Sequence, residues 1–369
     1  MGKVFTFFKG RVALYAILKS MGIGDKDEVI LPGFTCVVVP NAISYTGAIP
    51  VYVDIDIKNF NIDVDKIEEK ISKNTKAIIA QHTFGIPAEM DEIKKLCKKY
   101  NLFLIEDACH CLGSKYKGEE LGTIGDASFF SSQWSKPITT GLGGWAKINN
   151  DELLKKMEKE YERFIPPTSR EESLIELQYK VYSKLLTPKI FWTAQSIYRK
   201  VSSMGFAVGS STDDELEYEK PSGFEKRMGK KQINILNQKL SSVKEMISHR
   251  VKITNIYKEF FPEEYSLYLS ENSDIVFLRF PILVEDKKGI LVKARKEKIE
   301  IGDWFLSPLH PNMDGWEKVK YKKGSCKIAE EVCEHIINLP THEKISESEA
   351  KRIADFVKKH RGTYEYPIS

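Results

Sequence analysis

Short apolar runs alternate with longer amphipathic segments along the first 130 residues of the chain. A short apolar run bounded by turn residues is typical of a buried strand, and an apolar stripe repeated every three or four residues is typical of a helix. Strands are predicted at 27–32, 48–54, 76–81, 102–105 and 127–130, and helices at 10–22, 63–71 and 90–99. This alternation with short links predicts an α/β fold with a parallel or mostly parallel sheet.

The C-terminal part follows a different pattern. Residues 228–261 are strongly helical, 275–281 and 299–302 are predicted strands, and 346–360 is predicted to be a closing charged helix. The chain has 369 residues, which exceeds one typical core and indicates two domains. We therefore expect a large domain at 1–245 and a small α+β domain at 246–369.

Residues 151–222 interrupt this organisation and are predicted to be a helical insertion in the large domain. The run 179–206 mixes aromatic and basic residues at helical spacing, which fits a lid, a dimer contact or a helix on a membrane surface. We favour packing or an interface, because Pro188 breaks the run and no stretch reaches the roughly 20 apolar residues that a membrane span requires. The acidic segment 210–221 is predicted to be an exposed loop and a place for disorder.

Polar residues follow two of the predicted strands. Asp107 comes after 102–105, Ser131 comes after 127–130, and Lys136 stands five residues after Ser131, before a glycine run. Ligands of open α/β sheets sit beyond the carboxyl ends of the strands. A lysine can form a Schiff base, an acid can pair with a pyridinium nitrogen and a hydroxyl can bind a phosphate, so the set suits pyridoxal phosphate (PLP). The alternatives are a helix N-cap for Asp107 and a surface position for Lys136.

Four further residues are candidates for binding. Gly10 begins a predicted helix whose free N–H groups suit an anion, and Arg11 could add a guanidinium to a phosphate. His82 closes the strand 76–81, and His310 lies in the predicted loop 304–311, so both are candidate substrate contacts. For Gly10 and Arg11 an ordinary helix start with an exposed arginine is the favoured interpretation. A structural role for His82 and turn chemistry around His310 explain those residues equally well.

Charge and cysteine content narrow the class of protein. The net charge is +4 with scattered lysines, which favours a solvated surface and no nucleic-acid partner. Six cysteines without disulfide-framework spacing, and an N-terminus without a signal peptide, indicate reduced thiols in a cytoplasmic enzyme. The cluster Cys109–His110–Cys111 has no second pair, so we predict no metal site.

Several blocks of the sequence occur in the order found in one known family. They are LKSMGIGDKDEVILPGFT, NAISYTGAIPVYVDID, HTFGIPAEMDEI, EDACHCLGSKYKGEELGTIGDASFFSSQWSKPITTGLGG and NLPTH. With these blocks the chain resembles the DegT/StrS family of PLP-dependent sugar aminotransferases, which have fold type I. The resemblance implies a large domain with a mostly parallel central sheet flanked by helices, a small α+β C-terminal domain, and a homodimer with the site at the subunit interface.

The resemblance also assigns roles to individual residues. It implies that Lys136 holds the cofactor covalently and then moves the proton, that Asp107 pairs with the pyridine nitrogen and that His110 lies against the ring region. It implies that the phosphate is bound by Ser131 and by the helix start at Gly10, Arg11 and Val12.

The chain departs from the family pattern at four places. Cys36 stands where an aromatic residue usually stacks on the ring, and Arg11 and Val12 stand where the family usually has threonine or serine, so we expect phosphate contacts from backbone N–H groups or the guanidinium. Glu225, in the block 223–228, occupies the place of an asparagine that the second subunit often supplies. Gln133 and Trp134 replace the commoner residues before the lysine, and we count Cys36 and Gln133 among the cofactor-binding candidates.

The predicted function is a ping-pong transamination for polysaccharide biosynthesis. An amino acid, glutamate or glutamine, gives its amine to PLP, and the amine passes to a keto group of a nucleotide-linked sugar or a cyclitol. Two alternatives stay open. A sugar dehydratase of the same family would have histidine in place of Lys136, which argues against it. A non-enzymatic regulator or binding protein is compatible with the changes at Cys36, Arg11 and Glu225.

Overall fold

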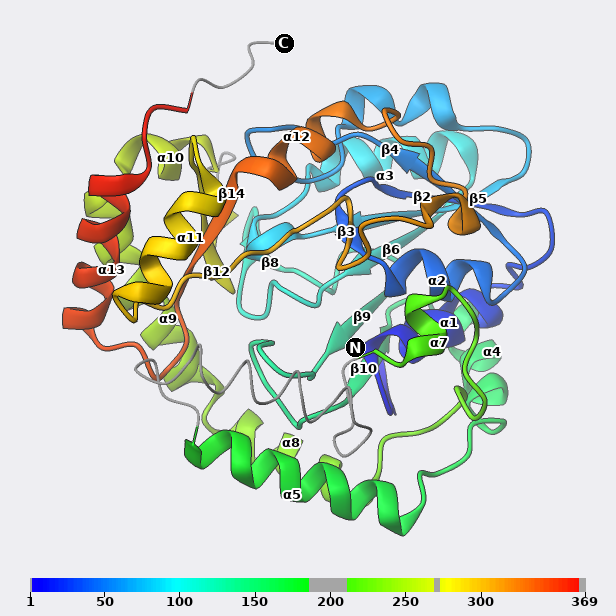
Figure 1. Cartoon of the computed structure of the whole chain (residues 1–369). Coiled ribbons are helices and arrows are strands. Elements are labelled where there is room, and N and C mark those ends of the chain that lie inside the picture. Colours follow the sequence, from blue (N-terminus) through cyan, green and yellow to red (C-terminus); the bar gives the residue numbers. More distant parts are fainter. Residues whose placement is uncertain (1, 186–210, 269–272, 365–369) are drawn as a thin grey trace.

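A seven-stranded sheet forms the centre of the computed structural model, which describes residues 2–185, 211–268 and 273–364 (Figure 1). In spatial order its strands are β1 (Lys3–Phe7), β10 (Gly144–Ile148), β9 (Ala127–Ser131), β6 (Phe103–Asp107), β5 (Thr75–Gln81), β2 (Glu28–Pro32) and β4 (Ile49–Val53). The last five run parallel, whereas β10 is antiparallel to both of its neighbours. The mostly parallel sheet is therefore confirmed, and all five predicted strands lie in it.

Helices cover both faces of this sheet. Helix α1 (Gly10–Ser20) packs on β9 and β10, and α3 (Met90–Tyr100) packs on β5 and β6. Within β5, Ala77 and Ile79 join one core cluster while Ile78 and Ala80 join another, as the alternation of side chains along a strand requires. A strand buried on both faces needs a continuous apolar run, which explains why 76–81 is apolar almost throughout.

The remaining elements of the first 150 residues are short. They are β3 (Thr35–Cys36), α2 (Val38–Ser44), η1 (Val64–Lys66), η2 (Glu68–Lys70), η3 (Thr83–Gly85), β7 (Lys115–Tyr116) and β8 (Glu119–Glu120). The helix predicted at 63–71 is wrong, because the segment forms the two separate 3₁₀ turns η1 and η2. Asp63 accepts a hydrogen bond from the N–H of Asp65, and of the apolar side chains here only Ile67 is fully buried. Local side-chain bonding thus replaces a helix that has little apolar surface to bury.

Two consecutive helices lead from the large sheet to the C-terminal part. The segment 228–261 forms α8 (Lys230–Ser241) and α9 (Val243–Phe260), and α9 packs against the closing helix α13 (Glu347–His360). The other elements are α10 (Pro262–Leu267), β11 (Ser273–Asp274), β12 (Arg279–Leu283), α11 (Lys287–Lys296), β13 (Leu309–His310), η5 (Trp316–Val319), α12 (Lys327–His335) and β14 (Ile336–Pro340). Helices and an antiparallel β12–β14 pair beside the central sheet agree with a small α+β unit (Figure 1). The exact boundary at 245 stays a prediction.

Two strand predictions in this part need correction. Only the end of 275–281 is a strand, because β12 begins at Arg279. The carbonyls of Phe277 and Leu278 accept bonds from the side chain of Thr341, at 2.7 and 2.9 Å, in place of a strand partner. Residues 299–302 form no strand, and Gly302 makes one isolated bridge to Asn338.

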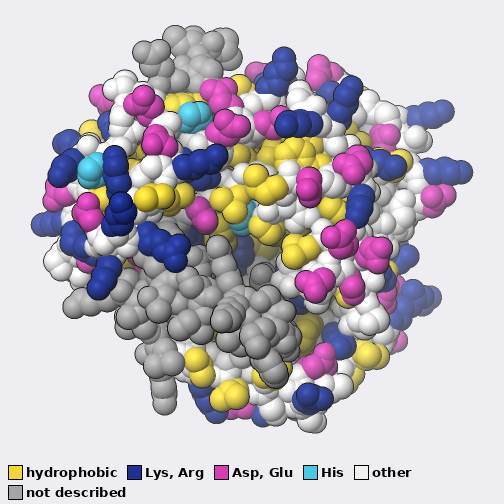
Figure 2. Space-filling view, in the orientation of Figure 1, with side chains coloured by type: hydrophobic (Ala, Val, Ile, Leu, Met, Phe, Trp, Pro, Cys, Tyr) yellow, Lys and Arg dark blue, Asp and Glu magenta, His cyan; other side chains and the backbone are white. Residues whose placement is uncertain are grey.

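The described part of the region 151–222 is partly helical. It contains α4 (Asp151–Tyr161), α5 (Ser169–Leu185) and α7 (Asp213–Leu216), and most of the run 179–206 lies outside the described residues. No described helix combines the length and the apolar content that crossing a bilayer requires. On the face drawn in Figure 2, basic and acidic side chains are interspersed, as the scattered charges of the sequence indicated.

Candidate active site

Lys136 lies in the loop that joins β9 to β10. Ser132, at the base of this loop, donates its N–H to the carbonyl of Gly143 at 2.9 Å, and its hydroxyl lies 2.8 Å from that of Thr140. These bonds tie both ends of the loop to the sheet. The Lys136 Nζ lies over the indole ring of Trp304, 5.2 Å from its centroid. The lysine is therefore held at the carboxyl end of β9, where the sequence placed it.

One cavity brings together most of the residues that the sequence singled out for a cofactor. Its lining includes Gly10, Arg11, Cys36, Asp107, His110, Ser131, Gln133 and Lys136. They come from the start of α1, the short strand β3 and the ends of β6 and β9. Since β6 and β9 are parallel neighbours, their carboxyl ends meet at the same edge. Val12, which the resemblance also implied, does not line this cavity.

Asp107 is the acid of this cavity. It is buried, and one carboxylate oxygen accepts the N–H of Cys109 at 3.1 Å. Burial raises the pKa of the Asp107 carboxyl above its usual value, although the bonds from Cys109 and the charge of Lys136 oppose the shift. The carboxylate makes no ion pair with a described residue, so a cation arriving in the cavity would stabilise its charged form.

His110 is held as a neutral ring. Its Nδ1 accepts the N–H of Phe84 at 3.2 Å, which leaves a proton on Nε2. Burial lowers the pKa of the His110 imidazole, and the charges of Lys136 and Arg279 lower it further. The ring stacks on Trp304 at a centroid distance of 5.8 Å. The flat, uncharged imidazole ring of His110 thus lines the cavity together with Lys136.

The first turn of α1 forms another polar part of the cavity, next to Ser131. Gly10 packs so tightly that a Cβ there would lie 3.1 Å from the Cβ of Ser131, so the glycine brings the helix start close to the hydroxyl. No side chain caps the N-terminus of α1. Uncapped N–H groups and the helix dipole favour a negative group at this position.

The guanidinium of Arg11 is bonded elsewhere. It pairs with Glu215 at 2.7 Å, and Lys9 reaches the other oxygen of the same carboxylate at 2.9 Å. Glu215 lies in α7 and is fully buried, so the prediction of an exposed acidic loop at 210–221 is wrong at its centre. Thr212 and Glu215 form a capping box, a spacing that is visible in the sequence and could have revealed this helix start.

Comparison with known proteins places this geometry in a family. Residues 2–358 match the model of the DegT/DnrJ/EryC1/StrS aminotransferase family. The chain belongs to that family. An uncharacterised protein of Methanocaldococcus jannaschii, MJ1066, is 31% identical over 355 residues, 94% of this chain and 82% of that protein.

Named relatives and solved structures of the DegT/DnrJ/EryC1/StrS aminotransferase family match as well. GDP-perosamine synthase of Escherichia coli O157:H7 is 47% identical over 149 residues, which is 40% of this chain and 41% of that protein. The crystal structure of a DegT DnrJ EryC1 StrS aminotransferase from Brucella abortus superimposes with a TM-score of 0.72 at 23% identity, over 98% of this chain and 86% of that one. The structural match supports the predicted fold type.

The residues of the cavity fit the cofactor of this family. PLP carries an aldehyde, a ring nitrogen that is cationic when protonated, and a phosphate. The cavity offers an amine at Lys136, a buried carboxylate at Asp107 that forms no ion pair with the described residues, and a hydroxyl with an uncapped helix start at Ser131 and Gly10. Each group of the cofactor thus meets a side chain or backbone group of matching chemistry.

The two histidines proposed for substrate are placed differently. His82 is fully buried, its Nε2 lies 3.1 Å from Glu106, and its Nδ1 accepts the N–H of Ala88 at 3.2 Å. It does not line the cavity that contains Asp107 and Lys136, so its side chain supports the fold. His310 accepts the N–H of Leu306 on Nδ1 at 3.2 Å, and burial lowers its pKa to about 4. Its contact with a substrate stays a prediction.

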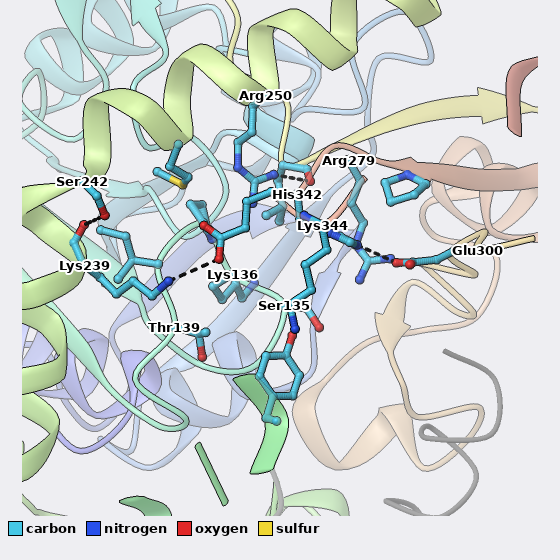
Figure 3. A pocket seen from close by; sticks show the side chains of 17 residues that line it. Ser135, Lys136, Thr139, Lys239, Ser242, Arg250, Arg279, Glu300, His342 and Lys344 are labelled. Carbon is cyan, nitrogen blue, oxygen red and sulfur yellow. Dashed lines mark hydrogen bonds and ion pairs between the residues drawn. The ribbon is translucent and has the colours of Figure 1, made fainter. Parts of the chain in front are cut away.

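The sequence did not single out the residues on the other side of Lys136. A second cavity includes Lys136, Arg250, Arg279 and Lys344 in its lining (Figure 3). Arg250 and Arg279 come from α9 and β12, and Trp304, from the loop before β13, packs on Arg279. No motif marked these side chains, because they belong to the C-terminal part and meet the lysine only in the folded chain. In the described part of the chain, no three acidic, cysteine or histidine side chains are grouped to hold a metal ion.

Proposed function

We propose that this protein is a PLP-dependent aminotransferase that moves an amino group from glutamate or glutamine to a keto group of a nucleotide-linked sugar or a cyclitol. The observation that carries the proposal is that Lys136 and Asp107 line one cavity together with Ser131 and the start of α1. Membership of the aminotransferase family and the partial match to GDP-perosamine synthase support the sugar as acceptor. Lysine at position 136 also argues against a dehydratase.

Each residue of the cavity has a physical task. Bound PLP supplies the electron sink of the reaction. Lys136 would provide the amine that holds the cofactor and a base that can carry the substrate proton. Asp107 would keep a proton on the ring nitrogen by its negative charge, and the first turn of α1 with Ser131 would bind the phosphate. The stacked rings of His110 and Trp304 exclude water from the side of the cavity next to Lys136.

The test replaces Lys136 by alanine and compares it with Lys155→Ala, an exposed lysine of α4. With added PLP, the wild-type protein and Lys155→Ala should turn yellow, and glutamate should shift that colour. Lys136→Ala should lose the shift and roughly 100- to 10,000-fold of turnover, the usual range for a general base. Borohydride should fix the cofactor on the peptide that contains Lys136.

Two outcomes contradict the proposal. A wild-type protein that stays colourless and inert with PLP would favour a regulator or binding protein. Cofactor fixed on another lysine would remove Lys136 from its role.

We also propose a homodimer in the cytoplasm. Helix α5 exposes Leu177 and Val181, 59% and 49% accessible, one turn apart on one side of the helix, and an apolar stripe of this kind suits a subunit contact. All six cysteines are free, which suits a reducing compartment. Sedimentation of the wild-type protein and of a Leu177→Glu, Val181→Glu variant tests the dimer, since a monomeric wild type would contradict it.

A further inference from the structure

Lys136 also lines a second cavity, which is rich in positive charge (Figure 3). Its lining contains the basic residues Lys136, Lys239, Arg250, Arg279 and Lys344, against the acids Glu300 and Glu343. Its volume is about 110 Å³. An excess of cations around a small hollow next to the reactive amine is suited to an anionic ligand.

Most of these cations are bonded within the protein. Lys239 pairs with Glu343 at 3.3 Å, and Lys344 donates to the carbonyl of Ser183 at 3.1 Å. The guanidinium of Arg250 donates to the carbonyl of Leu278 at 2.9 Å and to the hydroxyl of Thr341 at 2.7 Å. These side chains hold the walls of the cavity in place.

Arg279 is different. Its guanidinium is half-buried and makes no hydrogen bond or ion pair with any residue that the structure describes. The nearby carboxylate of Glu300 is bonded to His342 at 2.8 Å instead. An arginine presents a planar fork of donors that fits a carboxylate with two parallel bonds. The donors of the Arg279 guanidinium are therefore available to a ligand in this cavity.

The position of Arg279 relative to the lysine is fixed by one aromatic ring. The centroid of the Trp304 indole lies 4.6 Å from the Cζ of Arg279 and 5.2 Å from the Nζ of Lys136. Lys136 and Arg279 both line the second cavity, so a small ligand there can contact both cations. The cavity is small for a nucleotide, because pockets for ligands of that size usually enclose about 300 Å³ or more.

We infer that Arg279 binds a carboxylate of the amino-group donor in the second cavity, with Trp304 holding the guanidinium beside Lys136. This inference rests on the proposed aminotransferase function and adds the chemical class that the second cavity accepts. The nucleotide-linked acceptor then needs other contacts, so donor and acceptor binding depend on different residues.

The test uses the PLP-loaded enzyme and two probes that do not react. Glutarate carries the carboxylates of glutamate without its amine, and GDP carries a diphosphate. Arg279→Met should weaken glutarate binding roughly 10- to 100-fold, the loss expected for a charge-assisted pair, and leave GDP binding unchanged. Arg279→Lys should lose less, and the KM for glutamate should rise more than kcat falls. Arg352→Met, an exposed arginine of α13, is the matched control.

The possible outcomes separate the explanations. Loss of GDP affinity with unchanged glutarate affinity would overturn the inference in favour of a diphosphate site. Unchanged affinity for both probes in a variant with wild-type thermal stability would show that Arg279 binds neither. Failure of the wild-type protein to take up PLP or to react with glutamate would instead contradict the proposed function, and it is seen before any Arg279 variant is measured.

Discussion

The side-chain amide of Asn338 bonds both backbone polar groups of Trp304. Its Oδ1 accepts the N–H of Trp304 at 3.0 Å and its Nδ2 donates to the carbonyl at 2.8 Å. Asn338 is fully buried in β14, and its own backbone pairs with that of Gly302. A strand of the C-terminal part therefore fixes the indole that packs against His110, Lys136 and Arg279.

Replacing Asn338 by alanine should loosen this indole. Two partly buried backbone groups of Trp304 would lose their partners, and an unsatisfied group costs up to about 1–3 kcal/mol of unfolding free energy when it is fully buried. We expect a lower kcat and weaker glutarate binding in addition to the loss of stability, measured by urea unfolding and by steady-state kinetics.

The control for this variant is Asn150→Ala. Asn150 caps α4 by accepting the N–H groups of Glu152 and Leu153, and loss of a cap costs about 1 kcal/mol. It lies outside both cavities, so stability should fall without a change in kcat. Equal kinetics for the Asn338 variant and the wild type would show that Asn338 does not position Trp304 for the reaction.

Glu215 should contribute a stability that depends on pH. Burial alone would raise the pKa of its carboxyl, but Arg11 and Lys9 outweigh burial and lower it to about 2. A folded-state pKa below the unfolded value means that the stabilisation is fully present above pH 4.5 and is lost as the pH falls toward 2. Glu215→Gln should therefore be less stable near neutral pH by roughly 3–5 kcal/mol, the usual cost of breaking a buried pair, and its stability should depend less on pH in this window.

Urea unfolding at neutral pH and at pH values between 2 and 4.5 measures both effects, with Glu219→Gln, an exposed acid of the same segment, as control. The pKa of Lys9 is lowered as well, to about 8, because burial and the charge of Arg11 outweigh its bond to Glu215. A pH dependence of unfolding identical to that of the wild type would contradict the assignment.

Gly144→Ala should damage the phosphate end of the cofactor cavity. A Cβ at Gly144 would overlap the backbone N and Cα of Gly10 and the carbonyl of Phe130, which are main-chain atoms without freedom to rotate away. Overpacking of this kind costs about 1–3 kcal/mol, and it would push the start of α1 away from Ser131. We expect a lower melting temperature and weaker PLP affinity, measured by thermal unfolding and by absorbance titration.

The matched variant for this prediction is Gly24→Ala. The only heavy atom near a Cβ there is the carbonyl oxygen of Thr46, at 3.6 Å, so the change should stay within about 0.5 kcal/mol. A Gly144→Ala protein with wild-type stability and PLP affinity would show that α1 can shift without loss, contrary to the close packing.

Local pattern was sufficient for much of the fold and for the centre of the site. The strand 102–105 with Asp107 and the strand 127–130 with Ser131 became β6 and β9, because continuous apolar runs can be buried only inside a covered sheet. Parallel strands share one carboxyl edge, so the positions of Asp107 and Lys136 at one cavity followed from the order of elements. The helix predicted at 63–71 failed because charge periodicity was present without enough apolar surface.

The pattern of hydrophobic and polar residues did not predict contacts between residues far apart in the sequence. Glu215 stands in an acidic run that indicated exposure, and only its meeting with Lys9 and Arg11, about 200 positions away, explains its burial. The same holds for Arg279, which nothing in the sequence connects to Lys136. The sequence by itself determined the elements, the family and the residues at the strand ends, because these depend on local periodicity and motif. The tertiary structure decided which charges are paired and which guanidinium stays available, because these depend on how the C-terminal part packs on the sheet.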